Sequence, residues 1–425
     1  MKNRYQRTNQ KFKANFEVIG GRERVVQLPL PVLEALEGLQ PEVERLAAEA
    51  GLKILRGILE DEVTQRVGPP HHPSPAASCV RWGRQPGYAV YGGQKVSLEK
   101  PRVRTREGRE VELETYRQLQ QDGRMQRAVA ERMVCGLSTR KYRRAVQDVL
   151  QGYGIGKSSV SRHFVEASAE QLRELCERRL EELELVALLI DGIEFARQLM
   201  AVALGIAADG TKHVLGLWQG ATENTAVVTA LLEDLVARGL NPQRRYLVVI
   251  DGSKALRAGV ERVLGEGAVV QRCQIHKLRN VVEHLPEGCR ADWRRQLRNA
   301  WAMTEYAAAK AALERLWRRL CDVNPSAARS LEEGLEETLT LHRLRVPPLL
   351  RRSLRSTNVI ESCLSTVRHV SRNVKRWQAG DHVARWTAAG LIEAEKKFRK
   401  VKGFRELKEL GRILNPELHS REQVA

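Results

Sequence analysis

The sequence predicts an α/β protein in which a central mixed β-sheet is flanked by helical regions. Three observations lead to this prediction. Residues 184–276 contain short apolar runs of strand length, the segments on either side show helical periodicity, and the net charge is unevenly distributed. The chain of 425 residues is long enough for two to four domains, at ~100–200 residues for each domain.

Charge points to a polyanionic partner. The formal net charge is +19, from 71 Lys and Arg against 52 Asp and Glu. Residues 1–183 carry +8, residues 184–264 carry −1, residues 265–350 carry +3 and residues 351–425 carry +9. Nucleic acid is the default partner of such a basic chain. The near-neutral middle segment suits carboxylates that hold a metal ion between surfaces that bind phosphate.

Hydropathy and cysteine usage argue against a membrane or secreted protein. No apolar run approaches the ~18–20 residues of a membrane span, and the basic N-terminal segment lacks the apolar core of a signal peptide. The seven Cys show neither disulfide-scaffold nor zinc-ribbon spacing. We therefore expect a reducing cytoplasmic location and no membrane partner.

Helices and a hairpin are predicted for the N-terminal part. Apolar residues recur at helical spacing over 31–66 and predict two helices, with Pro41 just inside the second. A Pro-rich linker follows at 68–75. Residues 88–104 alternate around Gly92-Gly93, which predicts a small basic hairpin.

A candidate helix–turn–helix follows the hairpin. Ser138 can cap a helix that runs to about Leu150, residues 153–156 supply a turn, and a second helix begins near Ser158. Small polar and basic residues at the start of that helix suit the major groove. An ordinary helical hairpin with a basic face fits the spacing equally well. The DNA-contacting residues predicted here are Arg140, Lys141, Lys157, Ser161, Arg162 and His163.

The middle of the chain alternates between strands and helices. Its apolar runs are typical of strands buried on both faces, and Asp209-Gly210 marks a hairpin between two of them. Strands are predicted at 185–191, twice within 200–218, at 246–251 and at 267–273, and helices at 225–238 and 254–264. Three antiparallel strands followed by helix, strand, helix and strand form the ribonuclease-H-like layout.

Two of the predicted buried strands end in Asp-Gly. Asp191 and Asp251 would lie at the carboxyl edge of the sheet, where open α/β sheets place their sites. A pair of carboxylates in such a place is costly unless a divalent metal neutralises it. Two turn aspartates are the alternative, but two matching strands in this topology favour the metal site.

The helix predicted at 356–377 supplies the third carboxylate. Glu361 stands three residues after Asn358, which also fits a simple capping box. Basic residues follow Glu361 and would hold phosphates of a bound strand beside the metals. These residues are Arg368, Arg372, Lys375 and Arg376. The remaining basic tail is expected to be helical and to follow DNA next to the cleavage point.

Several segments resemble the bacterial insertion-sequence 256 transposases, which are related to the Mutator superfamily. They are LLIDG, GLWQGATEN, VVIDGSKAL, QRCQIHKLRN and STNVIES, and the resemblance extends from near Tyr88 to the basic tail. It implies a transposase of the Asp-Asp-Glu type with Asp191, Asp251 and Glu361 as catalytic metal ligands. It also implies a ribonuclease-H-like core that is interrupted by an all-helical insertion between Asp251 and Glu361.

The resemblance also implies the chemistry and the partners. Two Mg²⁺ (or Mn²⁺) ions per site would support cleavage at the transposon ends and joining of the freed 3′-OH ends to target DNA. The partners would be terminal inverted repeats, target DNA and a second copy in a homodimer, with no small-molecule substrate. Such a protein would be cytoplasmic and associated with the nucleoid.

Cys273 and His276 match the Cys-x-x-His signature of this family. No second pair at metal-ligand spacing accompanies them, so we expect structural residues near the site and no zinc. Trp293, Trp301 and Trp317 are expected in the core of the helical insertion.

The predicted domain organisation combines these segments. It comprises an N-terminal helical region (1–70), a linker with the basic hairpin (71–115), a helix–turn–helix DNA-binding region (116–183), the first part of the core (184–276), the all-helical insertion (277–350), and the last part of the core with the Glu361 helix and the basic tail (351–425). Two alternative functions stay open, a ribonuclease-H-fold nuclease and a non-catalytic DNA-binding protein derived from a transposase. A complete set of three carboxylates favours an enzyme.

Overall fold

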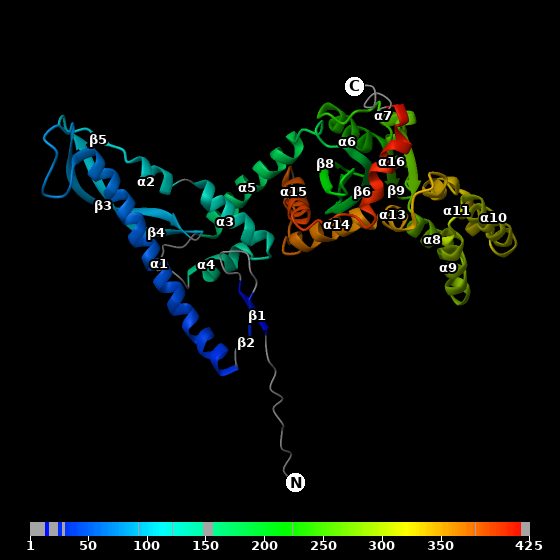
Figure 1. Cartoon of the computed structure of the whole chain (residues 1–425), viewed down its shortest axis with the longest axis horizontal. Coiled ribbons are helices and arrows are strands. Elements are labelled where there is room, and N and C mark those ends of the chain that lie inside the picture. The colour runs from blue at the N-terminus through cyan, green and yellow to red at the C-terminus, as the bar shows by residue number, and fades with distance from the viewer. Residues whose placement is uncertain are drawn as a thin grey trace, which may run out of the picture. The chain divides into compact units, whose positions relative to one another are not determined.

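The computed structural model describes residues 13–16, 24–27, 30–91, 93–120, 122–147, 156–222, 224–378 and 380–417. The chain divides into two compact units (Figure 1). The first unit comprises residues 1–131 and 137–164, and the second comprises residues 132–136 and 165–425.

The first unit combines helices with two small antiparallel sheets, β1-β2 and β3-β4-β5. Leu59 of its long first helix packs with Leu98 of the larger sheet and with Tyr116 in a common apolar core. Its elements are β1 (Lys13–Phe16), β2 (Arg24–Gln27), α1 (Leu30–Val67), β3 (Cys79–Tyr91), β4 (Gln94–Thr105), β5 (Glu110–Val111), α2 (Glu114–Leu119), α3 (Asp122–Val134) and α4 (Thr139–Gln147).

The basic hairpin is confirmed, although it is longer than predicted. β3 and β4 pair antiparallel, and the last described pair is Tyr91 opposite Gln94. Gly93 has a φ of 79°, a left-handed conformation that glycine adopts without steric cost. The strands extend from Cys79 to Thr105, beyond the predicted span.

The prediction of two helices over 31–66 is wrong, because α1 is a single helix of 38 residues. Pro41 lies inside it. An internal proline removes one backbone hydrogen bond and crowds the preceding turn. In α1 that local cost does not end the helix.

The helix–turn–helix candidate is described on both sides of its predicted turn. α4 begins beside Ser138, whose Oγ accepts a hydrogen bond from Lys141 N at 3.4 Å. The second helix is α5 (Lys157–Glu177), which starts in the first unit and continues into the second. Residues 153–155 of the predicted turn lie outside the described residues.

The second unit is built on a five-stranded sheet with the strand order β10-β9-β6-β7-β8. β6, β7 and β8 are antiparallel, whereas β9 and β10 run parallel to β6. The elements of this part are β6 (Leu185–Phe195), β7 (Gln198–Ala207), β8 (Lys212–Gly220), α6 (Thr225–Ala237), β9 (Tyr246–Ile250), α7 (Lys254–Leu264), η1 (Gly265–Gly267) and β10 (Ala268–Arg272). The predicted order of strands and helices is confirmed here.

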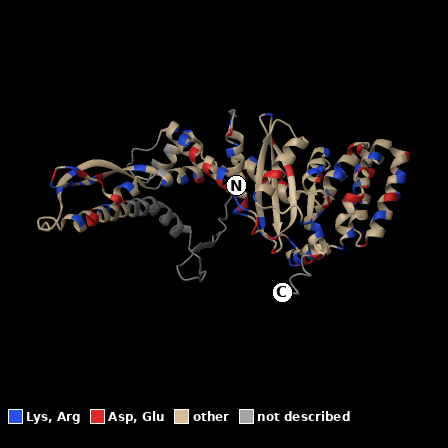
Figure 2. Cartoon of the chain, turned by 90° about the horizontal axis from the view of Figure 1, so that it is seen from above, with Lys and Arg blue, Asp and Glu red and all other residues tan. Residues whose placement is uncertain are grey.

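A helical block follows β10, as predicted, and it has an apolar core of its own. Trp293 and Trp301 are both buried in that core, whereas Trp317 packs at its edge. The block comprises α8 (Gln274–Glu283), α9 (Glu287–Ala302), α10 (Tyr306–Val323), α11 (Pro325–Glu332), η2 (Glu336–Leu339) and α12 (Thr340–Arg343). Lys and Arg positions recur along these helices (Figure 2).

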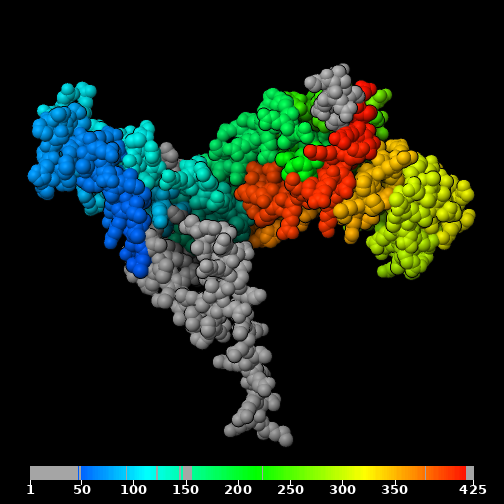
Figure 3. Space-filling model, in the orientation of Figure 1, coloured from blue at the N-terminus to red at the C-terminus, as the bar shows by residue number. Residues whose placement is uncertain are grey.

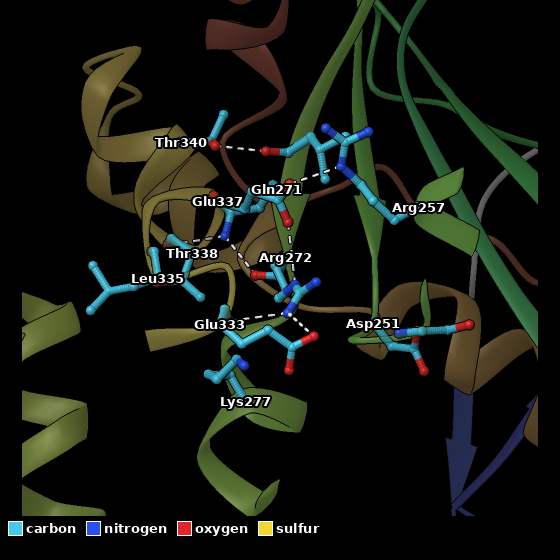
Figure 4. A network of polar contacts seen from close by, with 12 residues as sticks. Asp251, Arg257, Gln271, Arg272, Lys277, Glu333, Leu335, Glu337, Thr338 and Thr340 are labelled. Atoms are coloured by element: carbon cyan, nitrogen blue, oxygen red, sulfur yellow. Dashed lines mark hydrogen bonds and ion pairs between the residues drawn. The ribbon is translucent and has the colours of Figure 1, made fainter. Parts of the chain in front are cut away.

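A polar network fastens the helical block to the sheet (Figure 4). Arg272, buried at the end of β10, lies 3.3 Å from Oε2 of Glu337, and Oε1 of the same carboxylate accepts a hydrogen bond from Arg257 of α7. Gln271 donates a hydrogen bond to the carbonyl oxygen of Thr338 at 3.1 Å. Because these groups are largely removed from water, each one needs its partner in the opposing element.

The remaining helices return the chain to the sheet. They are α13 (Pro348–Leu354), α14 (Asn358–Ser371), α15 (His382–Glu395), η3 (Phe404–Glu406) and α16 (Leu407–Leu414). Figure 3 shows them in orange and red over the second unit. The helix predicted at 356–377 is therefore shorter than expected and ends at Ser371.

Helical layers cover both faces of the five-stranded sheet, which explains its nearly continuous apolar strands. On β6, Leu189 packs in the core shared with α14, α15 and α16. Leu188 and Ile190 point to the opposite face and pack in the core shared with α6 and α7. The alternation follows from the two-residue period of a strand.

The basic tail is packed into this core. Leu407, Leu410 and Leu414 of α16 are buried in the core that contains Leu189. The run of Lys near 396–400 is partly paired within the chain: Lys396 and Lys397 lie near Glu393, and Lys400 lies 3.1 Å from Asp209. The end of the basic tail is therefore folded onto the sheet, and the role of the tail in following DNA stays a prediction.

No helix in the described ranges is both long enough and apolar enough to span a bilayer.

Gly390 of α15 provides a test of this packing. A Cβ added to Gly390 would lie 2.8 Å from the Cα of Val367, which is backbone of α14 and cannot move aside cheaply. We expect Gly390→Ala to lower the free energy of unfolding by about 1–3 kcal/mol, measured by urea denaturation.

The matched control is Gly288→Ala, since no atom lies within 4 Å of the added methyl group in α9. Its free energy of unfolding should be unchanged or slightly higher, because Ala has the better helix propensity. Equal stability of the Gly390→Ala and wild-type proteins would contradict the close packing of α14 against α15.

Candidate active site

The strand register brings the two predicted aspartates to the same level of the sheet. β6 and β9 pair in parallel, with Leu189 opposite Val249 as the last paired residues. Two residues further along each strand are Asp191 and Asp251. Neighbouring strands lie about 4.8 Å apart, so the two carboxylates emerge beside each other at the edge where open α/β sheets place their sites.

Cys273 extends this row to the next strand. β9 and β10 pair in parallel up to Ile250 and Arg272, so Cys273 lies opposite Asp251. The backbone N–H of Cys273 donates a hydrogen bond to the carbonyl oxygen of Ile250 at 2.8 Å. The residue before Asp251 is thereby tied to the start of α8.

Asp191 lies within a strand, and the prediction that its strand ends there is wrong. β6 continues to Phe195 because its other neighbour, β7, pairs with it along its full length, with Asp191 opposite Val202. Ala196 and Arg197 form the connection to β7 and both have positive φ, 48° and 65°. The pairing of β6 with β9 ends at Leu189. Asp191 is therefore not paired with β9 on the side of its strand that faces Asp251.

Each aspartate carboxylate is oriented by the backbone beside it. Asp191 Oδ1 accepts a hydrogen bond from the N–H of Gly192 at 2.8 Å, and Asp251 Oδ1 accepts one from the N–H of Ser253 at 2.8 Å. Burial raises the pKa of Asp191 to about 6, and the negative charges of Asp251 and Glu361 add to the increase. Asp191 therefore experiences the charges of both other carboxylates.

Glu361 projects from the first turn of α14. Its N–H donates to the carbonyl oxygen of Thr357, the N-cap residue, at 2.9 Å, and its Oε1 accepts a hydrogen bond from the Thr357 hydroxyl at 2.6 Å. The alternative interpretation, a capping box between Asn358 and Glu361, does not apply, since Asn358 is already the first helical residue. The Glu361 side chain is 34% exposed, which leaves it accessible to a ligand.

Cys273 and His276 lie beside Glu361, and we call the group of Asp191, Asp251, Glu361, Cys273 and His276 the corner of the site. The Cys273 side chain is buried and its Sγ caps α8 by accepting the N–H of His276 at 3.5 Å. His276 Nε2 lies 3.9 Å from Glu361 Oε1. Burial opposes ionisation of the Cys273 thiol, but hydrogen bonds from His276 and Thr357 lower its pKa below the ordinary value.

His276 supplies positive charge among the carboxylates. Its interaction with Cys273 raises its pKa to about 9, and the charges of Glu361 and Asp251 act in the same direction. An imidazole with this pKa is protonated at neutral pH. One cation thus partly offsets three carboxylates, and the corner keeps an excess of negative charge.

This excess of carboxylate oxygen suits a hard divalent cation such as Mg²⁺. Within the described residues, no three His, Cys, Asp or Glu side chains are close enough together to form a ready-made metal site. The donor type and the uncompensated charge fit a metal, and closure of the carboxylates around an ion would complete its coordination.

The residues predicted to bind DNA in the first unit are nearly all at the surface. Arg140 and Lys141 are exposed on α4, and Lys157, Ser161 and Arg162 are exposed on α5. His163 differs, since its side chain is 5% exposed and faces the interior. Helical periodicity turns His163 away from the face that carries Arg162, and we therefore exclude it from the candidate DNA surface.

The basic residues after Glu361 are exposed, but only Arg368 stands on the same helix. Arg368 follows Glu361 by seven residues and shares its face of α14. Arg372 is the C-cap of α14, and its Nη1 donates to the carbonyl oxygen of His369 at 2.6 Å. Lys375 and Arg376 lie beyond the end of the helix, so the predicted continuous basic face is wrong.

Sequence reasoning did not identify Thr357 or Asn280 as site residues. Thr357 precedes the Asn358 helix start, and threonine is a common N-cap, so its position carried a recognisable signal. Asn280 stands one turn after His276 on α8, and its amide lies 3.6 Å from where a Cβ of Gly252 would be. No local pattern predicts that contact, because it depends on how α8 packs against the sheet.

Comparison with known proteins gives a consistent result. The family described as "Transposase, Mutator family" matches residues 39–400. The transposase for insertion sequence element ISRM5 of Rhizobium meliloti is 29% identical over 289 residues, which cover 66% of this chain and 71% of the relative.

Two further relatives have similar descriptions. The transposase for insertion sequence element IST2 of Acidithiobacillus ferrooxidans is 31% identical over 182 residues, 43% of this chain and 60% of the relative. The transposase for insertion sequence element IS256 in transposon Tn4001 of Staphylococcus aureus is 28% identical over 293 residues, 66% of this chain and 72% of the relative.

The raised pKa of Asp191 predicts a stability gain on neutralisation. The folded protein holds the Asp191 proton more tightly than the unfolded chain does, so ionisation of this residue destabilises the fold increasingly from about pH 4 to pH 6 and by a constant amount above. Without divalent metal, we expect Asp191→Asn to raise the free energy of unfolding at pH 7.5 by about 1–2 kcal/mol.

The measurement is urea unfolding in a chelator at several pH values. The gain should shrink as the pH is lowered from 6 toward 4, where the wild-type carboxyl becomes protonated. Asp322→Asn, at an exposed position of α10, is the control and should change little. A gain that stays the same at every pH would contradict the assigned environment of Asp191.

Proposed function

The chain belongs to the Mutator family of transposases, and we propose that it cleaves DNA at the ends of its insertion sequence and joins the freed ends to target DNA. The observation that carries this proposal is the parallel register of β6 and β9, which aligns Asp191 with Asp251. Glu361 would complete an Asp-Asp-Glu set, because its partner Thr357 contacts Cys273, which follows β10 at the level of Asp251.

We propose that the second unit has a ribonuclease-H-like core. Three antiparallel strands followed by two parallel strands, in the order β10-β9-β6-β7-β8, support this assignment. The helical block lies between Asp251 and Glu361 in the sequence and has a separate apolar core. Both properties are expected of a domain that is inserted into such a core.

Asp191, Asp251 and Glu361 would hold two Mg²⁺ or Mn²⁺ ions. When bound, such ions activate an oxygen nucleophile and neutralise charge on the phosphate that is attacked. The chain contributes the negative corner that attracts the ions. Backbone N–H groups hold one oxygen of each aspartate and leave the other oxygen available.

The two reactions exchange one phosphorus–oxygen bond for another. In cleavage, water attacks a phosphodiester, a new P–O bond forms, and the bond to the 3′ oxygen breaks to give a 3′-OH end. In joining, that 3′-OH attacks a target phosphodiester and a target 3′-OH leaves. Neither reaction needs a covalent link to the protein, so no Ser or Tyr nucleophile is required.

His276 would assist these reactions as a fixed positive charge. It lies beside Glu361 and its pKa of about 9 keeps it protonated at neutral pH. A cation at this place limits repulsion between the carboxylates and an incoming phosphate. Cys273 would shape the corner by capping α8, in keeping with its complete burial.

The first unit would bind the terminal inverted repeats. The exposed residues on α4 and α5 and the basic β3–β4 hairpin support this role. In the second unit, Arg368 is the best candidate for a phosphate contact because it shares a helix face with Glu361. Arg372, Lys375 and Arg376 are exposed nearby in the sequence and would contribute through charge alone.

Two copies of the chain would act together, because a transposon has two ends and each needs a catalytic site. The partners would be end DNA, target DNA and the second copy, in the cytoplasm at the nucleoid. A nuclease is the second candidate function, since the same three carboxylates would support hydrolysis without joining. Joining of a 3′-OH end is therefore the decisive activity.

Neutralising any of the three carboxylates should abolish catalysis. We expect Asp191→Asn, Asp251→Asn and Glu361→Gln each to lower strand cleavage and joining at least 100-fold in Mg²⁺, because each removes a metal ligand at nearly constant size. DNA affinity should stay within about threefold. The substrate is a duplex that contains the end of the element, with a plasmid as target.

Glu283→Gln, at an exposed position on α8, is the control and should retain full activity. A variant of the triad that joins DNA as well as the wild type does would show that its residue is wrongly assigned. Cleavage by the wild type without any joining would favour the nuclease.

Arg162 tests the recognition surface of the first unit. If its guanidinium makes a bidentate base contact, Arg162→Ala should weaken binding to end DNA by about 1–3 kcal/mol and leave binding to random DNA nearly unchanged. Fluorescence anisotropy over a salt series measures both affinities.

Arg173→Ala, further along α5, is the matched control, since Arg173 is exposed and pairs with Glu170. An equal loss on end DNA and random DNA with a shallower salt dependence would instead identify Arg162 as a phosphate contact.

A further inference from the structure

A short chain of buried contacts connects Asp251 to Glu361 through Thr357. The carbonyl oxygen of Ile250, directly before Asp251, accepts the N–H of Cys273. Cys273 Sγ in turn accepts a hydrogen bond from the N–H of Thr357 at 3.5 Å and lies 3.4 Å from the Thr357 hydroxyl oxygen. The Thr357 hydroxyl lies 2.6 Å from Glu361 Oε1.

We propose that Thr357 is a positioning residue that fixes the Glu361 carboxylate for metal binding. This inference rests on the proposed function, since it assigns Glu361 as a metal ligand. Thr357 is completely buried, whereas Glu361 is partly exposed. The buried end of the hydrogen bond is therefore held rigidly, and it restrains a side chain that would otherwise sample several rotamers.

The proton of the Thr357 hydroxyl goes to Glu361. A hydroxyl has one proton to donate and two lone pairs that accept. Its neighbours are Cys273 Sγ at 3.4 Å, His276 Nδ1 at 3.3 Å and Glu361 Oε1 at 2.6 Å. A carboxylate accepts only, and the short distance is typical of a charge-assisted O–H···O⁻ hydrogen bond.

This assignment orients the neighbouring histidine as well. With its proton on Glu361, the Thr357 oxygen accepts from Nδ1–H of His276, whose Nε2 then faces Glu361 Oε1 at 3.9 Å. Both contacts converge on Oε1. The other oxygen of Glu361, Oε2, is left without either restraint and is the one available for the metal.

The position of Thr357 in the fold explains why this residue carries the role. It is the N-cap of α14, so its backbone sets where that helix starts. The preceding turn is fixed by a second contact, in which Gln274 N donates to the carbonyl oxygen of Arg355 at 3.0 Å. The start of α8 is thereby connected to the segment that precedes α14. The hydrogen bond from Thr357 then positions Glu361 relative to this connection.

The test compares variants that remove or retain the hydroxyl. Thr357→Val keeps the size and the backbone N–H but removes the bond to Glu361, Thr357→Ala removes the methyl group together with the hydroxyl, and Thr357→Ser keeps the hydroxyl. The control is Thr340→Val, because the Thr340 hydroxyl is also buried and bonds a backbone carbonyl at 2.6 Å, away from the carboxylates.

The first readout is Mn²⁺ binding to the full-length chain without DNA, measured by electron paramagnetic resonance. We expect Thr357→Val and Thr357→Ala to weaken Mn²⁺ binding 10–100-fold, the usual effect of losing an outer-shell partner. Thr357→Ser should bind within about threefold of the wild type, and Thr340→Val should bind equally well. The melting temperature, recorded alongside, identifies any variant that fails to fold.

The second readout is the Mg²⁺ concentration that gives half-maximal strand cleavage. It should rise in Thr357→Val and Thr357→Ala and return toward the wild-type value in Thr357→Ser. Unchanged Mn²⁺ binding in both folded variants that lack the hydroxyl would overturn the proposal, as would an equal loss in Thr340→Val. A wild-type protein that binds Mn²⁺ but neither cleaves nor joins DNA would overturn the proposed function alone.

Discussion

The parallel pairing of β6, β9 and β10 is the constraint on which the candidate site depends. It sets Asp191, Asp251 and Cys273 at one level, although these residues lie far apart in the sequence. A shift of one residue between β6 and β9 would turn the apolar side chains of one strand to the wrong helical layer. The cores on both faces of the sheet therefore maintain the geometry of the carboxylates.

The third carboxylate depends on contacts that span a longer stretch of sequence. Glu361 belongs to a helix that packs on the sheet, and the start of that helix is fixed by the contact between Thr357 and Cys273, the residue that follows β10. The helical block lies between these two points, and Arg272, Gln271 and Glu337 fasten it to the same strand. The helical block thus has its own apolar core, and the spacing between β10 and α14 is set by the contact between Cys273 and Thr357.

Much of this arrangement could be predicted from the sequence, because strands buried on both faces leave clear apolar runs. The order of strands and helices, the Asp209-Gly210 hairpin and the positions of Asp191 and Asp251 all follow from local patterns. The continuation of β6 beyond Asp191 does not, since it depends on β7, which pairs with β6 over a longer stretch than β9 does. The continuation of α1 through Pro41 does not follow from local patterns either. The rest of the helix outweighs the local free-energy cost of the proline.

Other features required the three-dimensional contacts. The lysines near 396–400 have the sequence pattern of a free basic face, yet their pairing with Glu393 and Asp209 cannot be seen from composition. His163 adjoins Arg162 in the sequence but points inward. Thr357 stands at an ordinary N-cap position, but its hydroxyl makes no capping hydrogen bond and contacts Cys273, His276 and Glu361 instead.

The packing of α16 against the sheet has a consequence for biosynthesis. Leu407, Leu410 and Leu414 complete the same core that holds Leu189 of β6 and the inner face of α14. On the ribosome, the strands emerge long before the helices that cover this face. This core is complete only after α16 has been made, so a product of interrupted translation would present the three carboxylates above an incomplete core.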